Sequence, residues 1–325
     1  MENLVASMTN QPTLLITGGL GNLGSWLTDY FCRHTNYQVS ILASRKRPIL
    51  TDLNFTFIGC DIADRQAVAE SLRGRTFDHV VHTASVNDYF KDNFAEDALR
   101  VNALGTRNLL DHFKDQPELR QFVYFSTFQV YGQRNGLITE DTLPEPKNDY
   151  GTTHLFAEYY VKQFHANHGL PYATFRLTNS YGCPKDTDSS KWYLVLNDLA
   201  HMAVTEQKIV LKSNGQAARD FIWMGDVCNI IHQTLELPKP LNDAFNISGE
   251  QTYRMIDVAT SVQQAYREVY GEQLTIQVND NDTNQYADDL QVSSAKLRQK
   301  IPFATRNRFV EEAKKIFALV QSVSK

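Results

Sequence analysis

The 325-residue sequence predicts an α/β protein with a doubly wound parallel sheet and a smaller, mixed α/β lobe at its C-terminal side. Two observations predict this fold class. Short apolar runs alternate with helix-like segments through the first half of the chain, as in parallel sheets whose two faces are covered by helices. A glycine-rich turn directly follows the first apolar run, at the point where such sheets bind ligands.

The expected elements follow from the spacing of apolar residues. Strands are expected at residues 14–16, 39–43, 55–58, 79–83, 122–126 and 173–177. Helices are expected to open at 25–31 and to span 67–72, 95–113 and 151–168. After residue 180 the loops lengthen, and shorter helices are expected at 194–205, 256–270 and 309–323.

The glycine turn is the most informative segment. Gly18, Gly21 and Gly24 lie between a predicted strand and a predicted helix. Glycines let the backbone approach a pyrophosphate closely, and a helix N-terminus supplies free N–H groups with partial positive charge. The spacing is Gly-x-x-Gly-x-x-Gly rather than Gly-x-Gly-x-x-Gly, and a glycine-rich surface turn is the alternative. The flanking elements favour a dinucleotide site.

This turn suggests a division of the chain. Residues 1–11 form a flexible extension and 12–180 a dinucleotide-binding domain, to which 220–248 return. Residues 181–219 and 249–325 form a substrate-binding lobe.

Composition excludes several classes of protein. The net charge of −5 and pI of about 6.0 argue against binding to nucleic acid or an anionic membrane. We expect no membrane span and no signal peptide, because no run of about 20 apolar residues exists and the N-terminus lacks the basic-then-apolar pattern. The four cysteines form no Cys-x-x-Cys pair, which favours free thiols in the cytoplasm and no metal site.

Several motifs occur in an order that carries a family resemblance. They lie at residues 17–24, 61–62, 82–85, 102 with 105–106, 126–132, 150–154, 176–182 and 219–222. Over residues 12–320 this ordered set resembles the extended short-chain dehydrogenase/reductase family, whose members are NAD(P)-dependent nucleotide-sugar epimerases, dehydratases and ketoreductases. The resemblance implies a Rossmann-type sheet.

The resemblance also implies a coenzyme site. The glycines, with Asn22 and Leu23, hold the pyrophosphate, and Asp61 and Ile62 contact adenine. Ala84 leaves room beside the nicotinamide-side ribose. Further coenzyme contacts are expected from Thr83, Ser85, Asn102, Tyr150 and His154. Asp61 has an alternative as a loop cap. For His82 and Asn102 we favour a structural interpretation, as buried polar residues with satisfied hydrogen bonds.

The catalytic residues implied by the resemblance are Thr127, Tyr150 and His154. Thr127 occupies the serine or threonine position, where its hydroxyl hydrogen-bonds the reacting oxygen of the substrate. Tyr150 is the acid/base that exchanges a proton with a sugar hydroxyl while a hydride passes between sugar and nicotinamide. An ordinary aromatic residue at a helix start is the alternative for Tyr150.

One position departs from the family pattern, because His154 stands where the family has lysine. The i,i+4 spacing keeps His154 on the same helix face as Tyr150. An ammonium about 5 Å from a phenolate stabilises it by roughly 3 kcal/mol at an effective dielectric constant of about 20. Histidine supplies that charge only when protonated. We therefore predict that Tyr150 stays mostly protonated at neutral pH and serves best as a proton donor to a keto-sugar. A surface histidine on a catalytically silent relative is the alternative.

Two further segments bear on the type of reaction and on the choice of coenzyme. Family dehydratases carry an Asp-Glu pair after the catalytic threonine, and this chain has Phe128 and Gln129, which disfavours dehydration. The second predicted strand is followed by Ser44 and Arg45, with no acid for the adenosine ribose hydroxyls. A serine followed by arginine suits a 2′-phosphate, so NADP is favoured and NAD remains possible. A solvated basic loop is the alternative.

The resemblance places Asn179 and Arg219 on the nucleotide-sugar diphosphate, for which arginine is well suited. An ion pair with Asp220 is the alternative for Arg219.

Residues 95–113 and 151–168 are expected to form a four-helix homodimer interface, as in relatives. The expected function is reduction of a 4-keto group or C4 epimerisation of a nucleotide sugar. A coenzyme-binding sensor or scaffold, or a reductase of other carbonyl compounds, is the alternative.

Overall fold

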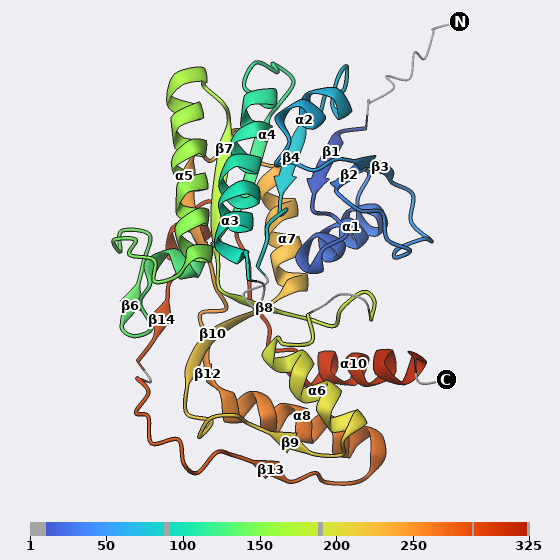
Figure 1. Cartoon of the computed structure of the whole chain (residues 1–325), viewed down its shortest axis with the longest axis vertical. Helices are drawn as coiled ribbons and strands as arrows, with labels where there is room; N and C mark the ends of the chain where they lie inside the picture. Colours follow the sequence, from blue (N-terminus) through green and yellow to red (C-terminus); the bar gives the residue numbers. More distant parts are fainter. Residues whose placement is uncertain (1–10, 88–91, 188–190, 288, 324–325) are drawn as a thin grey trace, which may run out of the picture.

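The computed structural model describes residues 11–87, 92–187, 191–287 and 289–323. At its centre lies a seven-stranded sheet in the order β11-β7-β5-β4-β1-β2-β3, with every neighbouring pair parallel (Figure 1). The strands are β1 (Thr13–Thr17), β2 (Gln38–Ala43), β3 (Thr56–Gly59), β4 (His79–His82), β5 (Gln121–Thr127), β7 (Tyr172–Leu177) and β11 (Asp243–Ile247). The predicted doubly wound α/β fold is confirmed.

Each strand buries side chains on both faces of the sheet, which is why the apolar runs are nearly continuous. In β1, Leu14 and Ile16 join one hydrophobic core, and Leu15 joins the other. Helices α1 (Asn22–His34) and α7 (Met224–Leu235) contribute to the first core. Helices α2 (Arg65–Ser71), α4 (Thr106–Phe113) and α5 (Asp149–His168) cover the second (Figure 1).

Helix α5 has a defined end on each side. The side chain of Asn148 accepts a hydrogen bond from the backbone N–H of Gly151 at 2.8 Å, which caps the N-terminus. Gly169 ends the helix in the left-handed conformation, with φ of 71°. These signals fix where α5 begins, and therefore where Tyr150 lies in its first turn.

The long α-helix expected at residues 95–113 is not continuous. The structure has α3 (Phe94–Ala98), a π-helical segment η1 (Leu99–Gly105) and then α4. In η1, the Asn102 side chain reaches the backbone of Val86, and Gly105 packs so closely on Ile62 that an added Cβ would lie 2.8 Å from its side chain. A wide π turn accommodates both contacts, and such turns occur often beside functional sites.

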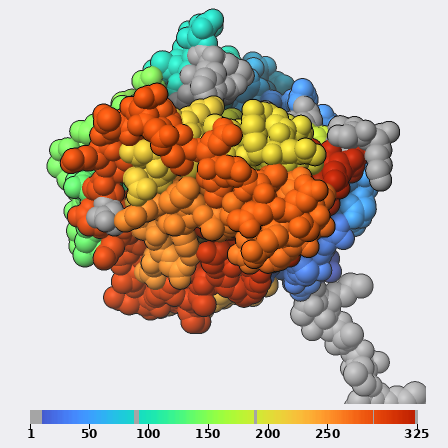
Figure 2. All heavy atoms as spheres, turned by 90° about the horizontal axis from the view of Figure 1, so that it is seen from below, coloured from blue at the N-terminus to red at the C-terminus, as the bar shows by residue number. Residues whose placement is uncertain are grey.

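A second lobe lies beyond the carboxyl ends of the strands. Its core is surrounded by the helices α6 (Val195–Thr205), α8 (Met255–Tyr270) and α10 (Phe309–Val323). Three small sheets pair β8 (Asn179–Tyr181) with β10 (Ala218–Trp223) and β12 (Thr252–Arg254), β9 (Ile209–Val210) with β13 (Ile276–Gln277), and β6 (Leu137–Ile138) with β14 (Gln291–Val292). The 3-10 turn η2 (Phe128–Tyr131) and the short α9 (Ala295–Arg298) complete the element list. Seen from below, residues from the last third of the chain form most of this face (Figure 2).

The chain returns from the lobe to the main sheet at α7. Strand β10 pairs within the small sheet, whereas α7 packs against α1 and β11 pairs with β7. The return therefore begins at Met224, four residues later than the expected position 220. The extension expected at residues 1–11 lies outside the described residues except for its last position. None of the described helices is long and apolar enough to cross a membrane.

The turn after β1 depends on Gly18, whose φ is +69° and whose added Cβ would lie 2.8 Å from the backbone of Ala84. Gly136 has a similar φ of +72° but open space around it. We expect Gly136→Ala to lower the free energy of unfolding by about 1–2 kcal/mol, the cost of the left-handed conformation alone. We expect Gly18→Ala to lower the free energy of unfolding by about 1–3 kcal/mol more than Gly136→Ala does, because the backbone at Ala84 or in the turn must move to make room for the added Cβ. Urea unfolding of both variants measures the difference, and equal losses would contradict the close packing.

Candidate active site

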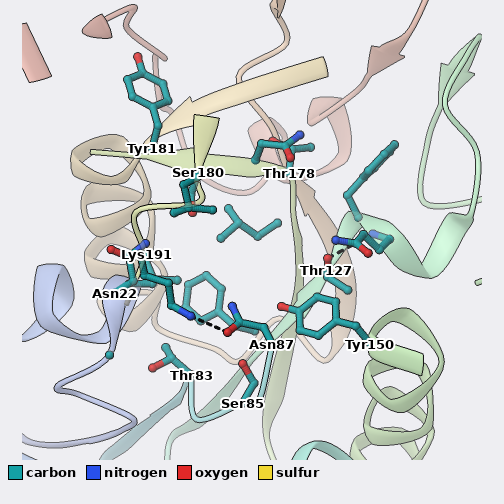
Figure 3. A pocket seen from close by; sticks show the side chains of 18 of the residues that line it. Asn22, Thr83, Ser85, Asn87, Thr127, Tyr150, Thr178, Ser180, Tyr181 and Lys191 are labelled. Carbon is teal, nitrogen blue, oxygen red and sulfur yellow. Dashed lines mark hydrogen bonds between the residues drawn. The ribbon is translucent and has the colours of Figure 1, made fainter. Parts of the chain in front are cut away.

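A cleft of about 600 Å³ lies at the carboxyl edge of the sheet, between the two lobes. One wall comes from the glycine turn and the start of α1, the floor from the ends of β4 and β5, and another wall from the start of α5. The second lobe contributes residues from β8, α6 and β10. The predicted site residues that line this cleft are Gly18, Gly21, Asn22, Leu23, Gly24, Thr83, Ser85, Thr127, Tyr150, His154, Asn179 and Arg219 (Figure 3).

The glycine turn has the geometry of a phosphate cradle. An added Cβ at Gly24 would lie 2.1 Å from the carbonyl oxygen of Gly18, so no side chain fits between the turn and the helix. The first turn of α1 presents backbone N–H groups that have no partner within the helix. These features fit an anionic group of a dinucleotide.

Thr127 and Tyr150 lie on neighbouring elements that meet at the cleft. Thr127 is the last residue of β5, and its hydroxyl oxygen accepts a hydrogen bond from the backbone N–H of Gln129 at 3.2 Å. Tyr150 lies in the first turn of α5 and is partly exposed. Its hydroxyl points into the cleft, beside Thr127 and Asn87 (Figure 3). The two side chains can therefore reach one ligand from the same side.

His154 lies one helical turn beyond Tyr150, with the two ring centroids 4.4 Å apart. It is only 3% exposed, so the alternative of a surface histidine is wrong. Burial lowers the pKa of His154 to about 3, against a weaker favourable interaction with the backbone of Phe125. The imidazole is thus neutral at physiological pH and supplies no positive charge to Tyr150.

A buried ion pair fixes the spacing between β5 and α5. The carboxylate of Glu158 on α5 accepts hydrogen bonds from the Ser126 hydroxyl on β5 at 2.6 Å and from the Arg176 guanidinium on β7 at 2.7 Å. Both members of the pair are almost completely buried. Arg176 also donates to the hydroxyl of Tyr131 at 2.9 Å. Because Ser126 precedes Thr127, this network sets the position of Thr127 relative to α5.

Six of the predicted site residues do not line the cleft. Asn102 is fully used behind it, accepting from Val86 N–H and donating to the Val86 carbonyl and to Thr153. This corrects the coenzyme contact expected of Asn102 and agrees with the structural interpretation favoured above. His82 likewise lies between the hydroxyls of Thr17 and Thr106, and burial lowers its pKa to about 3.

The other five lie around the rim of the cleft or beneath the glycine turn. Asp61 accepts from the backbone N–H of Ala63, as the loop-cap alternative expects, and Ile62 is buried against Gly105. Ala84 packs under Gly18. Ser44 and Arg45 are exposed beyond the end of β2. The side chain two residues further on, Arg47, is the one that lines the cleft.

Several residues that line the cleft were not assigned to it from the sequence, among them Arg47, Lys191 and Asn87. Arg47 donates to the carbonyl of Leu20 at 2.9 Å and forms an ion pair with Asp186 of the second lobe. Lys191 reaches across the cleft and donates to the side-chain oxygen of Asn87 at 2.6 Å (Figure 3). Asn87 follows β4 at the carboxyl edge of the sheet, which is the one sequence signal that could have identified it.

The second lobe presents Asn179 and Arg219 to the cleft. The amide of Asn179 donates to the backbone carbonyl of Asp220 at 2.8 Å, which joins β8 to β10. The alternative of an Arg219–Asp220 ion pair is wrong, because the Asp220 carboxylate turns inward to Thr178 and the N–H of Gly249. Partial burial and the nearby charge of Arg134 lower the pKa of Arg219. An anionic ligand would offset that repulsion.

The buried neutral His154 predicts a specific pH dependence of stability. Between its ordinary pKa of 6.5 and the folded-state value of about 3, the unfolded chain binds a proton that the native ring does not. The free energy of unfolding should therefore decrease as the pH is lowered from about 6.5 towards 3, by up to about 1.4 kcal/mol per pH unit from this residue. We expect His154→Gln to flatten the dependence measured by urea unfolding at pH 5 and pH 7. His165→Gln, on the same helix, is the control, and equal flattening by both would contradict the assignment.

Comparison with known proteins places this geometry in context. Residues 14–248 match the model of the NAD dependent epimerase/dehydratase family. The dTDP-D-glucose 4,6-dehydratase of Dictyostelium discoideum is 26% identical over 277 residues, which cover 77% of this chain and 61% of that relative. The low-salt glycan biosynthesis protein Agl12 of Haloferax volcanii is 26% identical over 246 residues, covering 73% of this chain and 76% of its own length.

Solved structures share the fold over nearly the whole chain. UDP-glucuronic acid 4-epimerase from Bacillus cereus, in complex with NAD, superposes with a TM-score of 0.79 at 22% identity and covers 96% of this chain and 100% of its own. dTDP-glucose 4,6-dehydratase from Bacillus anthracis, also with NAD, has a TM-score of 0.75 at 19% identity, covering 96% and 97%. Because the family model matches most of the chain, this protein belongs to the NAD dependent epimerase/dehydratase family.

Proposed function

We propose that this protein is a nicotinamide-dependent oxidoreductase that acts on a nucleotide-activated sugar, either reducing a 4-keto group or inverting C4 through transient oxidation. The observation that carries the proposal is the meeting of the glycine turn, Thr127 and Tyr150 in one cleft. The two dTDP-glucose 4,6-dehydratases and the UDP-glucuronic acid 4-epimerase described above are named for nucleotide-sugar substrates, which supports the substrate class.

The roles of the side chains follow from their positions. A bound nicotinamide coenzyme would supply hydride transfer to or from the sugar carbon. The glycine turn and the N-terminus of α1 hold its pyrophosphate, and Thr83 and Ser85 lie on the nicotinamide side. Thr127 orients the reacting sugar oxygen, and the Tyr150 phenol gives that oxygen a proton or takes one from it. Arg219 and Asn179 receive the diphosphate of the sugar nucleotide.

The neutral state of His154 favours reduction of a keto-sugar over oxidation of a sugar hydroxyl. A lysine ammonium would stabilise the Tyr150 phenolate, the form that acts as a base. The neutral imidazole does not, so the phenol acts best as a proton donor during reduction of a keto-sugar. Dehydration is disfavoured, because Phe128 and Gln129 line the cleft directly after Thr127 and neither side chain can exchange a proton at neutral pH.

For the coenzyme we favour NADP, with NAD as the alternative. Residues 43–47 contain no acid, and Ser44 and Arg45 are exposed beyond β2, where a 2′-phosphate would lie. NAD is named in the structures of both neighbours described above, which is why the two coenzymes must be compared directly. The Asp186 carboxylate already neutralises Arg47, so we assign the 2′-phosphate contact to Arg45.

The first experiment is ligand-induced stabilisation of the purified protein. We expect NADPH and NADH each to raise the melting temperature, NADPH at the lower concentration, because binding to the native state stabilises it by mass action. Arg45→Ser should remove the preference while leaving NADH binding unchanged. No stabilisation by either coenzyme would overturn the proposed function. Stabilisation without turnover of UDP-4-keto-6-deoxyglucose, its dTDP equivalent or UDP-glucose would favour a sensor or scaffold.

The electrostatic argument is tested with His154→Lys, which places an ammonium beside Tyr150. The variant should raise the ratio of sugar oxidation to keto-sugar reduction by at least about tenfold, since roughly 3 kcal/mol of phenolate stabilisation becomes available. His154→Gln keeps the position neutral, so its ratio should stay near that of the wild type. The measurement is the pH–rate profile in both directions, and an unchanged ratio in the lysine variant would contradict the argument.

We also propose a homodimer formed through the surface of η1 and α5. These two elements pack side by side and expose Leu99, Leu104, Phe156 and Tyr159 to solvent. Exposed apolar residues gathered on adjacent helices are typical of a symmetric helix–helix interface.

Phe156→Glu combined with Tyr159→Lys should convert the dimer to a monomer, because charges would be buried at its centre. Sedimentation velocity gives the mass directly. Leu143→Glu, at a highly exposed apolar residue outside both elements, should leave the dimer intact. A wild-type protein that sediments as a monomer would refute this interface.

A further inference from the structure

A buried carboxylate ties together segments that connect the two lobes. Asp220 lies in β10 and is only 1% exposed. Its Oδ1 accepts a hydrogen bond from the hydroxyl of Thr178 at 2.6 Å and another from the backbone N–H of Gly249 at 2.8 Å. Thr178 joins β7 of the main sheet to β8 of the second lobe, and Gly249 lies where the chain leaves β11 for β12. Asp220 therefore holds β10 at two points where the chain passes from one lobe to the other.

The junction around Asp220 is closely packed. An added Cβ at Gly249 would lie 1.9 Å from the carbonyl oxygen of Phe221, which follows Asp220 in β10. The carbonyl of Gly249 accepts a hydrogen bond at 2.9 Å from the hydroxyl of Thr305, in the segment between α9 and α10. Because so little space is left, a change in the contacts of Asp220 must shift β10 relative to the main sheet.

The two residues that we propose for the diphosphate both depend on the position of Asp220. Arg219 precedes it in β10, and successive side chains of a strand point to opposite faces. Arg219 accordingly lines the cleft, whereas the Asp220 side chain is buried. The amide of Asn179 donates to the main-chain carbonyl of Asp220 at 2.8 Å. A shift of Asp220 would therefore move both groups that face the ligand.

The acceptor oxygen of Asp220 is the property that these contacts use. Burial raises the pKa of Asp220 to about 6, against hydrogen bonds from Thr178 and from the backbone N–H groups of Gly249 and Gln251, which lower it. The hydroxyl of Thr178 and the N–H of Gly249 share one oxygen. A neutral amide presents an acceptor oxygen of the same kind. Asparagine should therefore keep these two hydrogen bonds, and leucine should lose them.

We propose that Asp220 is a positioning residue, which fixes the distance between the diphosphate site and the reacting groups of the cleft. Its side chain anchors β10 to the end of β7, and β7 pairs with β5, which carries Thr127. It acts on the ligand only through Arg219 and Asn179. This rests on the proposed function for the identity of the ligand, the diphosphate of a nucleotide sugar.

The anchoring contact is measured in the ligand-free protein by hydrogen exchange. The N–H of Gly249 should exchange slowly, because the Asp220 carboxylate holds it in a buried hydrogen bond. Asp220→Leu removes the acceptor at similar size and should speed this exchange by about tenfold or more. Asp220→Asn should exchange at nearly the wild-type rate. Rapid exchange at Gly249 in the wild type would overturn the proposal, even if neither variant folded.

The consequence for binding is measured by calorimetric titration with UDP and dTDP, and separately with NADH and NADPH. Asp220→Leu should weaken binding of the nucleoside diphosphates by about tenfold, the size of one charge-assisted hydrogen bond. Coenzyme affinity should change by less than about twofold, because the glycine turn belongs to the other lobe, and Asp220→Asn should bind both ligands like the wild type. Asp226→Leu is the matched control, since that buried carboxylate accepts from the backbone N–H of Arg306 at 2.7 Å and does not line the cleft.

Several outcomes would refute a positioning role for Asp220. They are equal losses of UDP affinity in Asp220→Leu and Asp226→Leu, an equal loss of coenzyme affinity, or a loss in Asp220→Asn as large as that in Asp220→Leu. If Asp220→Leu did not fold, Thr178→Val would remove one donor and should weaken UDP binding by about threefold, so unchanged affinity would count against the proposal. If the wild type bound neither UDP nor dTDP, the proposed function would fail together with the assigned ligand, whereas exchange at Gly249 would still report on the anchoring contact alone.

Discussion

The candidate active site depends on the buried carboxylate of Glu158. It ties α5 to β5 through Ser126 and to β7 through Arg176, so three elements share one polar contact inside an apolar core. Removing either charged partner would leave the other buried and uncompensated, at a cost of about 3–5 kcal/mol. Apolar packing alone permits small shifts of a helix along a sheet, whereas a hydrogen-bonded ion pair fixes the position of the helix relative to the strands. Thr127 and Tyr150 meet because this contact fixes the elements that carry them.

Beneath the cleft lies a layer of neutral polar side chains. His82 hydrogen-bonds Thr17 and Thr106, and His154 hydrogen-bonds Tyr124. Both imidazoles are kept neutral by burial, which lowers their pKa values to about 3. The layer beneath the cleft therefore contains hydrogen-bonding groups that carry no charge at neutral pH. No ammonium therefore lies at position 154 to assist the acid/base role that we propose for Tyr150.

The second lobe completes the cleft through a few polar bridges. Arg47 pairs with Asp186 over the glycine turn, and Lys191 reaches Asn87 from the opposite side. Each bridge joins a loop at the carboxyl edge of the sheet to a segment more than 100 residues away. Local sequence patterns give no information about such pairings, so Arg47 and Lys191 could not be placed in the cleft from the sequence. Arg45 looked equivalent to Arg47 because both belong to the same basic run.

The sequence by itself determined the class of fold, the order of the elements in the first domain and the glycine turn. These follow from local rules: buried strands are continuously apolar, helices begin at caps such as Asn148, and a turn packed as closely as Gly18–Gly24 accepts no side chain. Motif order also placed Thr127 and Tyr150. What only the tertiary structure decided was the environment of each polar group. Asn102 is fully occupied by Val86 and Thr153, and a π turn interrupts its helix. Tyr124, which resembles any core aromatic in the sequence, proved to be the partner of His154, because burial and hydrogen-bond geometry arise from segments that meet only when the chain is folded.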